Sequence, residues 1–242
     1  MRQLVVMLVA AGSMLFNSAA GEASAETVDL ELVLLADGSR SIDQAEIRFQ
    51  REGYASAITH PEVLDAIAQG FEQRIAVTYV EWGDASSQEV VVPWTVVDGP
   101  ESASAFAAAL LEAPRRAAGP NAIGNALAAA HGLIESNAFD GYRKVIDFSG
   151  DSAWSFGGMP VAQARAAALA ADIVINGLAI LCRAAECSGR PVNYDLEKAF
   201  AETIIGGPGS FVVTADRDDQ FALAVRRKLL LEIAGGPASG AG

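Results

Sequence analysis

Strand-like and helix-like segments alternate along residues 28–233, and this alternation limits the chain to few folds. Apolar runs bounded by turn residues predict strands, and apolar residues at helical spacing predict helices. The predicted strands cover residues 28–35, 74–82, 89–97, 144–149, 173–181 and 211–214. The predicted helices cover residues 42–58, 62–68, 101–112, 122–136, 161–171, 196–204 and 218–233. Such a pattern implies right-handed crossovers and an α/β fold with helices on both faces of a mostly parallel sheet.

The third predicted strand departs from the parallel arrangement. Only the short turn at residues 83–87 separates it from the second strand, so the two should form a hairpin. Pro93 within it suits an edge position, because proline has no backbone N–H to donate to a neighbouring strand. We therefore predict a doubly wound, Rossmann-like, six-stranded sheet with one antiparallel edge strand. Residues 26–234 form one domain, followed by a flexible tail at 235–242.

Residues 1–25 differ in kind from the rest. A positive start at Arg2, an apolar run over residues 4–16 and the small residues at 23–25 are typical of a cleaved secretory signal. We expect a periplasmic or secreted protein that begins near Glu26 and has no integral membrane segment after cleavage. In such a compartment the closely spaced Cys182 and Cys187 should form a local disulfide.

The formal net charge of −13 restricts the partners of the chain. A nucleic-acid-binding surface needs clustered Lys and Arg to replace phosphate counterions, so a nucleic-acid partner is not expected. An acidic surface is compatible with cation binding, although solubility alone explains most of such charge.

Oxygen-bearing side chains follow two of the predicted strands. Asp37, Ser39 and Ser41 come directly after the first strand, on what we expect to be a solvent-facing loop, and Asp151 follows the fourth. Asn121 opens the helix between them. Ligands of open α/β sheets bind at the carboxyl ends of the strands, near the switch point where these two strands should be neighbours. Hydroxyl and carboxylate oxygens suit a hard cation such as Mg²⁺.

These residues resemble a known family. Asp37, Ser39 and Ser41 match the Asp-x-Ser-x-Ser signature of the metal-ion-dependent adhesion site of von Willebrand factor A domains, and the Asp151 loop matches the late aspartate of that site. The wider chain looks like an uncharacterised family of exported bacterial von Willebrand A-like proteins, over residues 27–234. The resembling stretches include residues 79–82, 145–151 and 204–209. Asn121 departs from the pattern, because it falls where the family usually has threonine.

The resemblance implies a function and a role for each residue. Ser39 and Ser41 would ligate Mg²⁺ or Mn²⁺ directly, and Asp37 and Asp151 would act mainly through bound waters. Asn121 would ligate through its amide oxygen, with altered reach. The implied function is a metal-dependent binding module that engages an acidic group on a partner protein or surface polymer. The alternative is a periplasmic metal-dependent hydrolase of phosphate or sugar esters, which needs a base near the metal.

Other interpretations of these residues stay open. Asp37, Ser39 and Ser41 could cap a helix, and so could Asn121. Glu81 and Asp147 could support the site or serve as the base of a hydrolase, but a structural hydrogen bond is the simpler expectation for both. Arg115 and Arg116 are expected to be a solvated pair. Trp154 is the best aromatic candidate for the rim of the site.

Catalysis finds little support in the sequence. The chain has no G-x-S-x-G nucleophile elbow. His60 and His131 lie away from the expected site, so both are interpreted as structural. We therefore predict no enzymatic activity and no catalytic residue.

Overall fold

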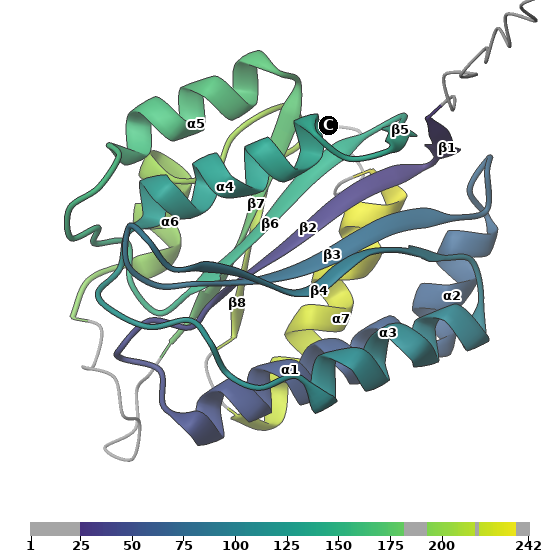
Figure 1. Ribbon diagram of the computed structural model, residues 1–242, viewed down its shortest axis with the longest axis horizontal. Helices are drawn as coiled ribbons and strands as arrows, with labels where there is room; N and C mark the ends of the chain where they lie inside the picture. Colours follow the sequence, from purple (N-terminus) through teal and green to yellow (C-terminus); the bar gives the residue numbers. More distant parts are fainter. Residues whose placement is uncertain (1–24, 182–192, 216–217, 236–242) are drawn as a thin grey trace, which may run out of the picture.

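A computed structural model describes residues 25–181, 193–215 and 218–235 of the chain. Its main sheet has six strands in the order β4-β3-β2-β6-β7-β8, and only β4 runs antiparallel to its neighbour (Figure 1). This is the predicted fold class, with the predicted antiparallel edge. The six strands are β2 (Leu30–Asp37), β3 (Ile75–Trp82), β4 (Gln88–Val97), β6 (Lys144–Gly150), β7 (Ile173–Ile180) and β8 (Val212–Ala215).

Helices cover both faces of this sheet (Figure 1). One face packs against α1 (Gln44–Ile58), α2 (Pro61–Ala68), α3 (Pro100–Glu112) and α7 (Asp218–Ala234). The other packs against α4 (Ile123–Glu135), α5 (Val161–Ala170) and α6 (Leu196–Thr203). Along β2, Leu32 and Leu34 belong to the first core and Val33 and Leu35 to the second. A strand buried on both faces needs an uninterrupted apolar run, as this sequence has.

The first helix begins two residues later than predicted. Its N-cap is Asp43, whose carboxylate accepts hydrogen bonds from the backbone N–H groups of Ala45 at 2.7 Å and Glu46 at 2.9 Å. The Glu46 side chain accepts in return from the N–H of Asp43, which completes a capping box. The capping alternative for Asp37, Ser39 and Ser41 is therefore wrong, because Asp43 fills that role.

The first predicted strand is in fact two. A short strand β1 (Glu26–Val28) pairs in parallel with β5 (Phe139–Gly141), which the sequence analysis did not predict. The interruption is Asp29, whose carboxylate accepts from the backbone N–H groups of Phe71, Glu72 and Arg74. These hydrogen bonds connect the break between β1 and β2 to the turn before β3.

Some sequence predictions lie outside the described residues. These are the signal segment apart from its last residue, the Cys182–Cys187 disulfide and the tail after residue 235. Among the helices of the described part, none has the length and apolar character needed to cross a membrane.

Candidate metal centre

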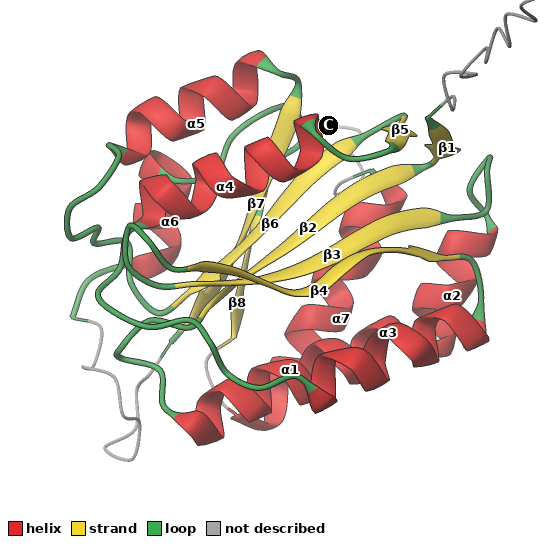
Figure 2. Cartoon of the chain, viewed as in Figure 1, coloured by secondary structure: helices red, strands yellow, loops and turns green. Residues whose placement is uncertain are grey.

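The parallel pairing of β2 with β6 brings the predicted site residues to one edge of the sheet. Leu35 is level with Phe148, so Asp37 ends its strand beside Gly150, and Asp151 follows directly. Figure 2 shows loops gathered where these strands end. Gly150 permits this close approach, because a Cβ at that position would lie 3.3 Å from Asp37 Oδ2.

Four of the five predicted residues form a connected polar group. The backbone N–H of Ser39 donates to Asp37 Oδ1 at 2.8 Å, and the hydroxyl oxygens of Ser39 and Ser41 lie 3.1 Å apart. The side chains of Ser41 and Asp151 are also hydrogen-bonded. The hydroxyl and carboxylate oxygens of two separate loops therefore converge on a single location.

Asp37 is not on a solvent-facing loop, contrary to expectation. Asp37 and Ser39 are fully buried. The N–H of Gly38 donates to the carbonyl of Trp82, and Ala117 packs so close that a Cβ on Gly38 would lie 2.8 Å from it. Neighbouring loops thus cover the start of the motif.

The carboxylates of Asp37 and Asp151 are incompletely hydrogen-bonded. Asp37 Oδ2 and Asp151 Oδ1 are buried, and neither has a hydrogen-bond partner in the described part of the chain. Burial, together with the nearby charge of Asp151, raises the pKa of Asp37 to about 7. Burial also raises the pKa of Asp151, against the lowering effect of the Ser41 hydrogen bond. A divalent cation would satisfy both orphaned oxygens and relieve the repulsion between the carboxylates.

The donor set therefore fits a hard divalent cation that binds through mixed oxygen ligands. Within residues 25–181, 193–215 and 218–235, no three His, Cys, Asp or Glu side chains are grouped to hold a metal ion. A metal at this edge would accordingly use hydroxyl oxygens and water beside the two carboxylates, as Mg²⁺ sites do.

Asn121 lies in a loop that touches both halves of the group. The carbonyl of Gly119 accepts from the N–H of Arg40 at 2.8 Å, and the carbonyl of Asn121 accepts from Phe156 at 2.6 Å. Asn121 is 7% exposed. It does not cap α4, because the N-cap residue of that helix is Ala122. Its place beside the edge is compatible with the predicted ligand role.

Arg115 has a role that the sequence analysis missed. Its Nη2 donates to the carbonyls of Gly38 and Ser39, at 3.1 Å each. The guanidinium thus holds the backbone of the loop at residues 37–41, and of the pair expected to be solvated only Arg116 is exposed. Two adjacent arginines in a predicted loop give no sign of which one turns inward, since that depends on how the loop packs.

Glu81 and Asp147 both have structural partners. Glu81 pairs with Arg51 of α1 at 2.7 Å, and Asp147 pairs with Lys228 of α7 at 2.7 Å. Both partners come from helices on the α1 and α7 face, and all four side chains are buried. The expectation of a structural role is met, although the partners are helix side chains rather than groups of the sheet.

Exposed aromatic side chains lie in the loop that follows Asp151. Trp154 and Phe156 are each 64% exposed. The Trp154 ring meets Tyr194 edge-on, with centroids 6.3 Å apart, and the Tyr194 hydroxyl accepts from the N–H of Ala153. Large exposed aromatic groups next to a candidate site are typical of a contact surface.

Solved structures share this fold at low sequence identity. A von Willebrand factor type A protein from Catenulispora acidiphila is 16% identical, with a TM-score of 0.59, and the match covers 86% of our chain and 43% of that chain. Proximal thread matrix protein 1 from the mussel byssus, with a zinc-occupied MIDAS motif, is 17% identical with a TM-score of 0.59. That match covers 88% of our chain and 49% of that chain. The chain thus spans less than half the length of these two proteins.

A third structure matches over nearly its whole length. It is the von Willebrand factor domain of the type V pili tip protein Mfa5 from Porphyromonas gingivalis, 10% identical with a TM-score of 0.56, over 90% of our chain and 99% of that chain. These likenesses establish the fold alone. A search of curated proteins found no match.

A family model resolves the affiliation of the sequence. The model described as "Protein of unknown function (DUF1194)" matches residues 27–237, which is most of the chain. The matched residues include every strand of the main sheet and every helix of the described part. The chain belongs to the DUF1194 family, and its fold is that of the von Willebrand factor type A domain.

Proposed function

We propose that the protein is an exported binding module that engages an acidic group of a partner protein or surface polymer through a divalent cation. The cation, Mg²⁺ or Mn²⁺, is held by Asp37, Ser39, Ser41 and Asp151, with Asn121 beside them. The observation that carries this proposal is that Asp37 and Asp151 each have one buried carboxylate oxygen without a hydrogen-bond partner in the described residues. Such groups are costly unless a cation or a proton satisfies them.

The chemistry of the ligands favours an acidic partner. Ser39 and Ser41 offer neutral hydroxyl oxygens, and only two carboxylates are available. Neutral ligands leave the cation with much of its positive charge, so a bound metal supplies an attachment point for a carboxylate from outside. Arg115 keeps the loop backbone in place, and Trp154 adds apolar surface nearby.

The proteins of similar fold support a binding role. One is a matrix protein with a zinc-occupied MIDAS motif, and another is the tip protein of a pilus. The hydrolase alternative has less support, because the two candidate bases, Glu81 and Asp147, are already paired with Arg51 and Lys228. We therefore favour adhesion over catalysis.

Binding to a defined acidic polymer tests the proposal. Poly-L-glutamate is immobilised, and residues 26–242 are applied in Mn²⁺ or in chelator, with dextran as the neutral control. We expect binding that requires Mn²⁺ and that weakens by about tenfold or more in Asp37→Asn. Asp43→Asn is the matched control, since it removes the same charge from an exposed helix cap in the same loop. Binding that persists in chelator, or that survives Asp37→Asn unchanged, contradicts the proposal.

A further inference from the structure

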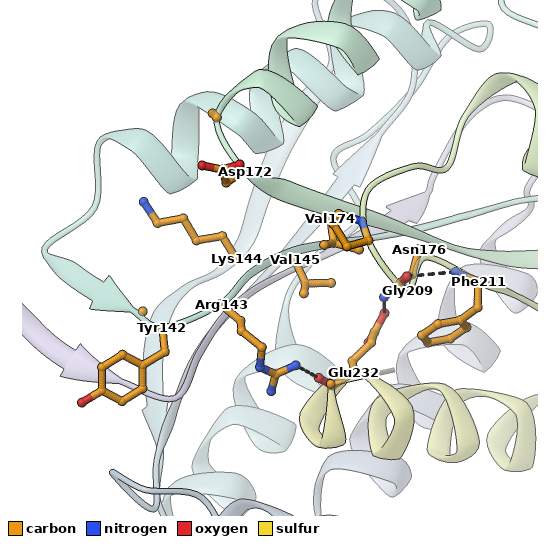
Figure 3. A pocket seen from close by; sticks show the side chains of 14 residues that line it. Tyr142, Arg143, Lys144, Val145, Asp172, Val174, Asn176, Gly209, Phe211 and Glu232 are labelled. Carbon is orange, nitrogen blue, oxygen red and sulfur yellow. Dashed lines mark hydrogen bonds between the residues drawn. The ribbon is translucent and has the colours of Figure 1, made fainter. Parts of the chain in front are cut away.

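A cavity of about 350 Å³ lies at the other end of the sheet, where β6 and β7 begin (Figure 3). Its lining includes Lys144 and Val145 from the start of β6, Val174 and Asn176 from β7, and Glu232 from the last turns of α7. It shares no residue with the candidate metal centre. A volume of this size accommodates a small molecule, about as large as an amino acid, rather than only a few waters.

Four charged residues line this cavity, and Glu232 is the fully buried one, whereas Asp172 is exposed and Arg143 and Lys144 are half-buried. Figure 3 shows the Glu232 side chain reaching from α7 into the ring of lining residues, toward Asn176. Oε1 accepts from Lys228 Nζ at 2.5 Å and from Asn176 Nδ2 at 3.1 Å. Oε2 is buried, and no hydrogen-bond donor for it exists in the described part of the chain. A buried carboxylate oxygen without a donor is expensive, so this lining is chemically incomplete.

The charges around Glu232 do not balance. Lys228 also pairs with Asp147 at 2.7 Å, so one buried ammonium serves two buried carboxylates. Arg143 is close, but its guanidinium donates to the backbone carbonyls of Glu232 and Ile233 and so neutralises the end of α7. Lys144 lies 3.9 Å from Glu135 in an ion pair at the surface. The pair of carboxylates therefore needs one more positive charge, which is either a proton or a cation.

We propose that this cavity binds a small aliphatic ligand with a primary ammonium group, which donates a hydrogen bond to Glu232 Oε2. The remaining walls suit the aliphatic part of such a ligand, because Val145, Val174 and Phe211 contribute apolar surface. The ammonium would supply the missing charge in the place of a proton. This site is independent of the proposed metal centre and is assigned from its own residues.

Ligand binding at this site should depend on pH. Burial and the nearby charge of Asp147 raise the pKa of Glu232 to about 7, against the lowering effects of Lys228 and Asn176. Below that pH an incoming ammonium must displace a proton, and above it the carboxylate is already free. Binding should therefore tighten as the pH rises from about 6 to about 8, with release of a proton at the lower pH.

The test uses n-butylammonium as the probe and n-butanol as its neutral counterpart, by calorimetry on residues 26–242. We expect butylammonium to bind and butanol not to bind, and Glu232→Gln to weaken butylammonium binding by about tenfold or more. Val174→Phe, which fills the cavity and leaves Glu232 in place, should have the same effect. Circular dichroism and thermal unfolding establish that each variant is folded.

Asp37→Asn is the control that separates this site from the metal centre. We expect it to bind butylammonium as the wild type does, whatever happens to metal binding. Equal affinity in Glu232→Gln and the wild type would overturn the proposal. So would failure of the folded wild type to bind, or binding of butanol as tightly as butylammonium.

Discussion

Arg115 fixes the backbone of the loop at residues 37–41 without being one of the proposed metal ligands. It donates to the carbonyls of Gly38 and Ser39, between the three residues of the motif. Without it the carbonyl of Gly38 loses this donor and that of Ser39 keeps only the N–H of Ile42, so the hydroxyl groups of Ser39 and Ser41 are less firmly spaced. We expect Arg115→Gln to weaken Mn²⁺ binding by about tenfold, the size of effect typical of groups that orient metal ligands. Arg116→Gln removes the same charge from an exposed neighbour and should leave the affinity unchanged. Titration of both variants with Mn²⁺ measures the difference, and equal affinities would show that Arg115 is not a positioning residue.

Asn121 is the position where the chain departs from the family pattern. An amide oxygen can ligate, but threonine offers a hydroxyl, which hard cations accept with less distortion of the loop. We expect Asn121→Thr to preserve Mn²⁺ affinity or to tighten it by up to about tenfold. The same titration decides the matter, with Asn193→Thr, a change at an exposed asparagine, as the control. A clear loss of affinity in Asn121→Thr would show that the amide is required.

For single residues, the sequence shows the proposed ligands but not the residues that support them. The spacing of Asp37, Ser39 and Ser41 is local, so it can be seen in the sequence. The burial of Asp37 and the inward turn of Arg115 depend on residues 113–119, which fold over the loop from far along the chain. No local pattern records such packing.

At the scale of elements, Asp29 separates β1 from β2. Its carboxylate accepts three backbone N–H groups from residues 71–74, which joins the start of β2 to the turn before β3. Removing it leaves those donors unpaired, so Asp29→Ala should lower the free energy of unfolding by about 1–3 kcal/mol. Asp140→Ala, an exposed position on β5, should change it by less than about 0.5 kcal/mol. Denaturant unfolding compares them, and similar stabilities would refute the role of Asp29.

The longer elements and their order follow from periodicity, which is strong wherever a strand is buried on both faces or a helix has one apolar stripe. β1 and β5 have only three residues each, too few for a period to be visible. They exist because Glu31, buried in β2, accepts from the N–H of Gly141 and from Asn137. Contacts between residue 31 and residues 137–141 cannot be predicted from either segment alone.

At the scale of the whole molecule, buried carboxylates lie near both ends of the sheet, and they give stability a distinct pH dependence. The raised pKa of Glu232, about 7 against an ordinary 4.5, means that the folded chain holds a proton more tightly than the unfolded chain. Burial also raises the pKa of Asp147, against the lowering effect of Lys228. Protonation therefore stabilises the fold, and stability should fall as the pH rises from about 4.5 to about 7.

In Glu232→Gln the loss of unfolding free energy as the pH rises from about 4.5 to about 7 should be smaller by up to roughly 3 kcal/mol. The reason is that each pKa unit corresponds to about 1.4 kcal/mol. The raised pKa of Asp37 also makes stability fall as the pH rises. Because Asp37 is present in both proteins, the difference between variant and wild type reports on Glu232 alone. Denaturant unfolding at several pH values in chelator measures it. Glu101→Gln, an exposed change, should retain the slope of the wild type. The same slope in Glu232→Gln would contradict this explanation.

The central claim is that a divalent cation binds where Asp37 and Asp151 converge. Calorimetric titration of residues 26–242 with Mn²⁺ tests it most directly, on the wild type, Asp37→Asn and Asp43→Asn. We predict a single site in the wild type, an affinity lower by at least about tenfold in Asp37→Asn, and an unchanged affinity in Asp43→Asn. Equal affinities in all three proteins, or no Mn²⁺ binding by the folded wild type, would contradict the claim.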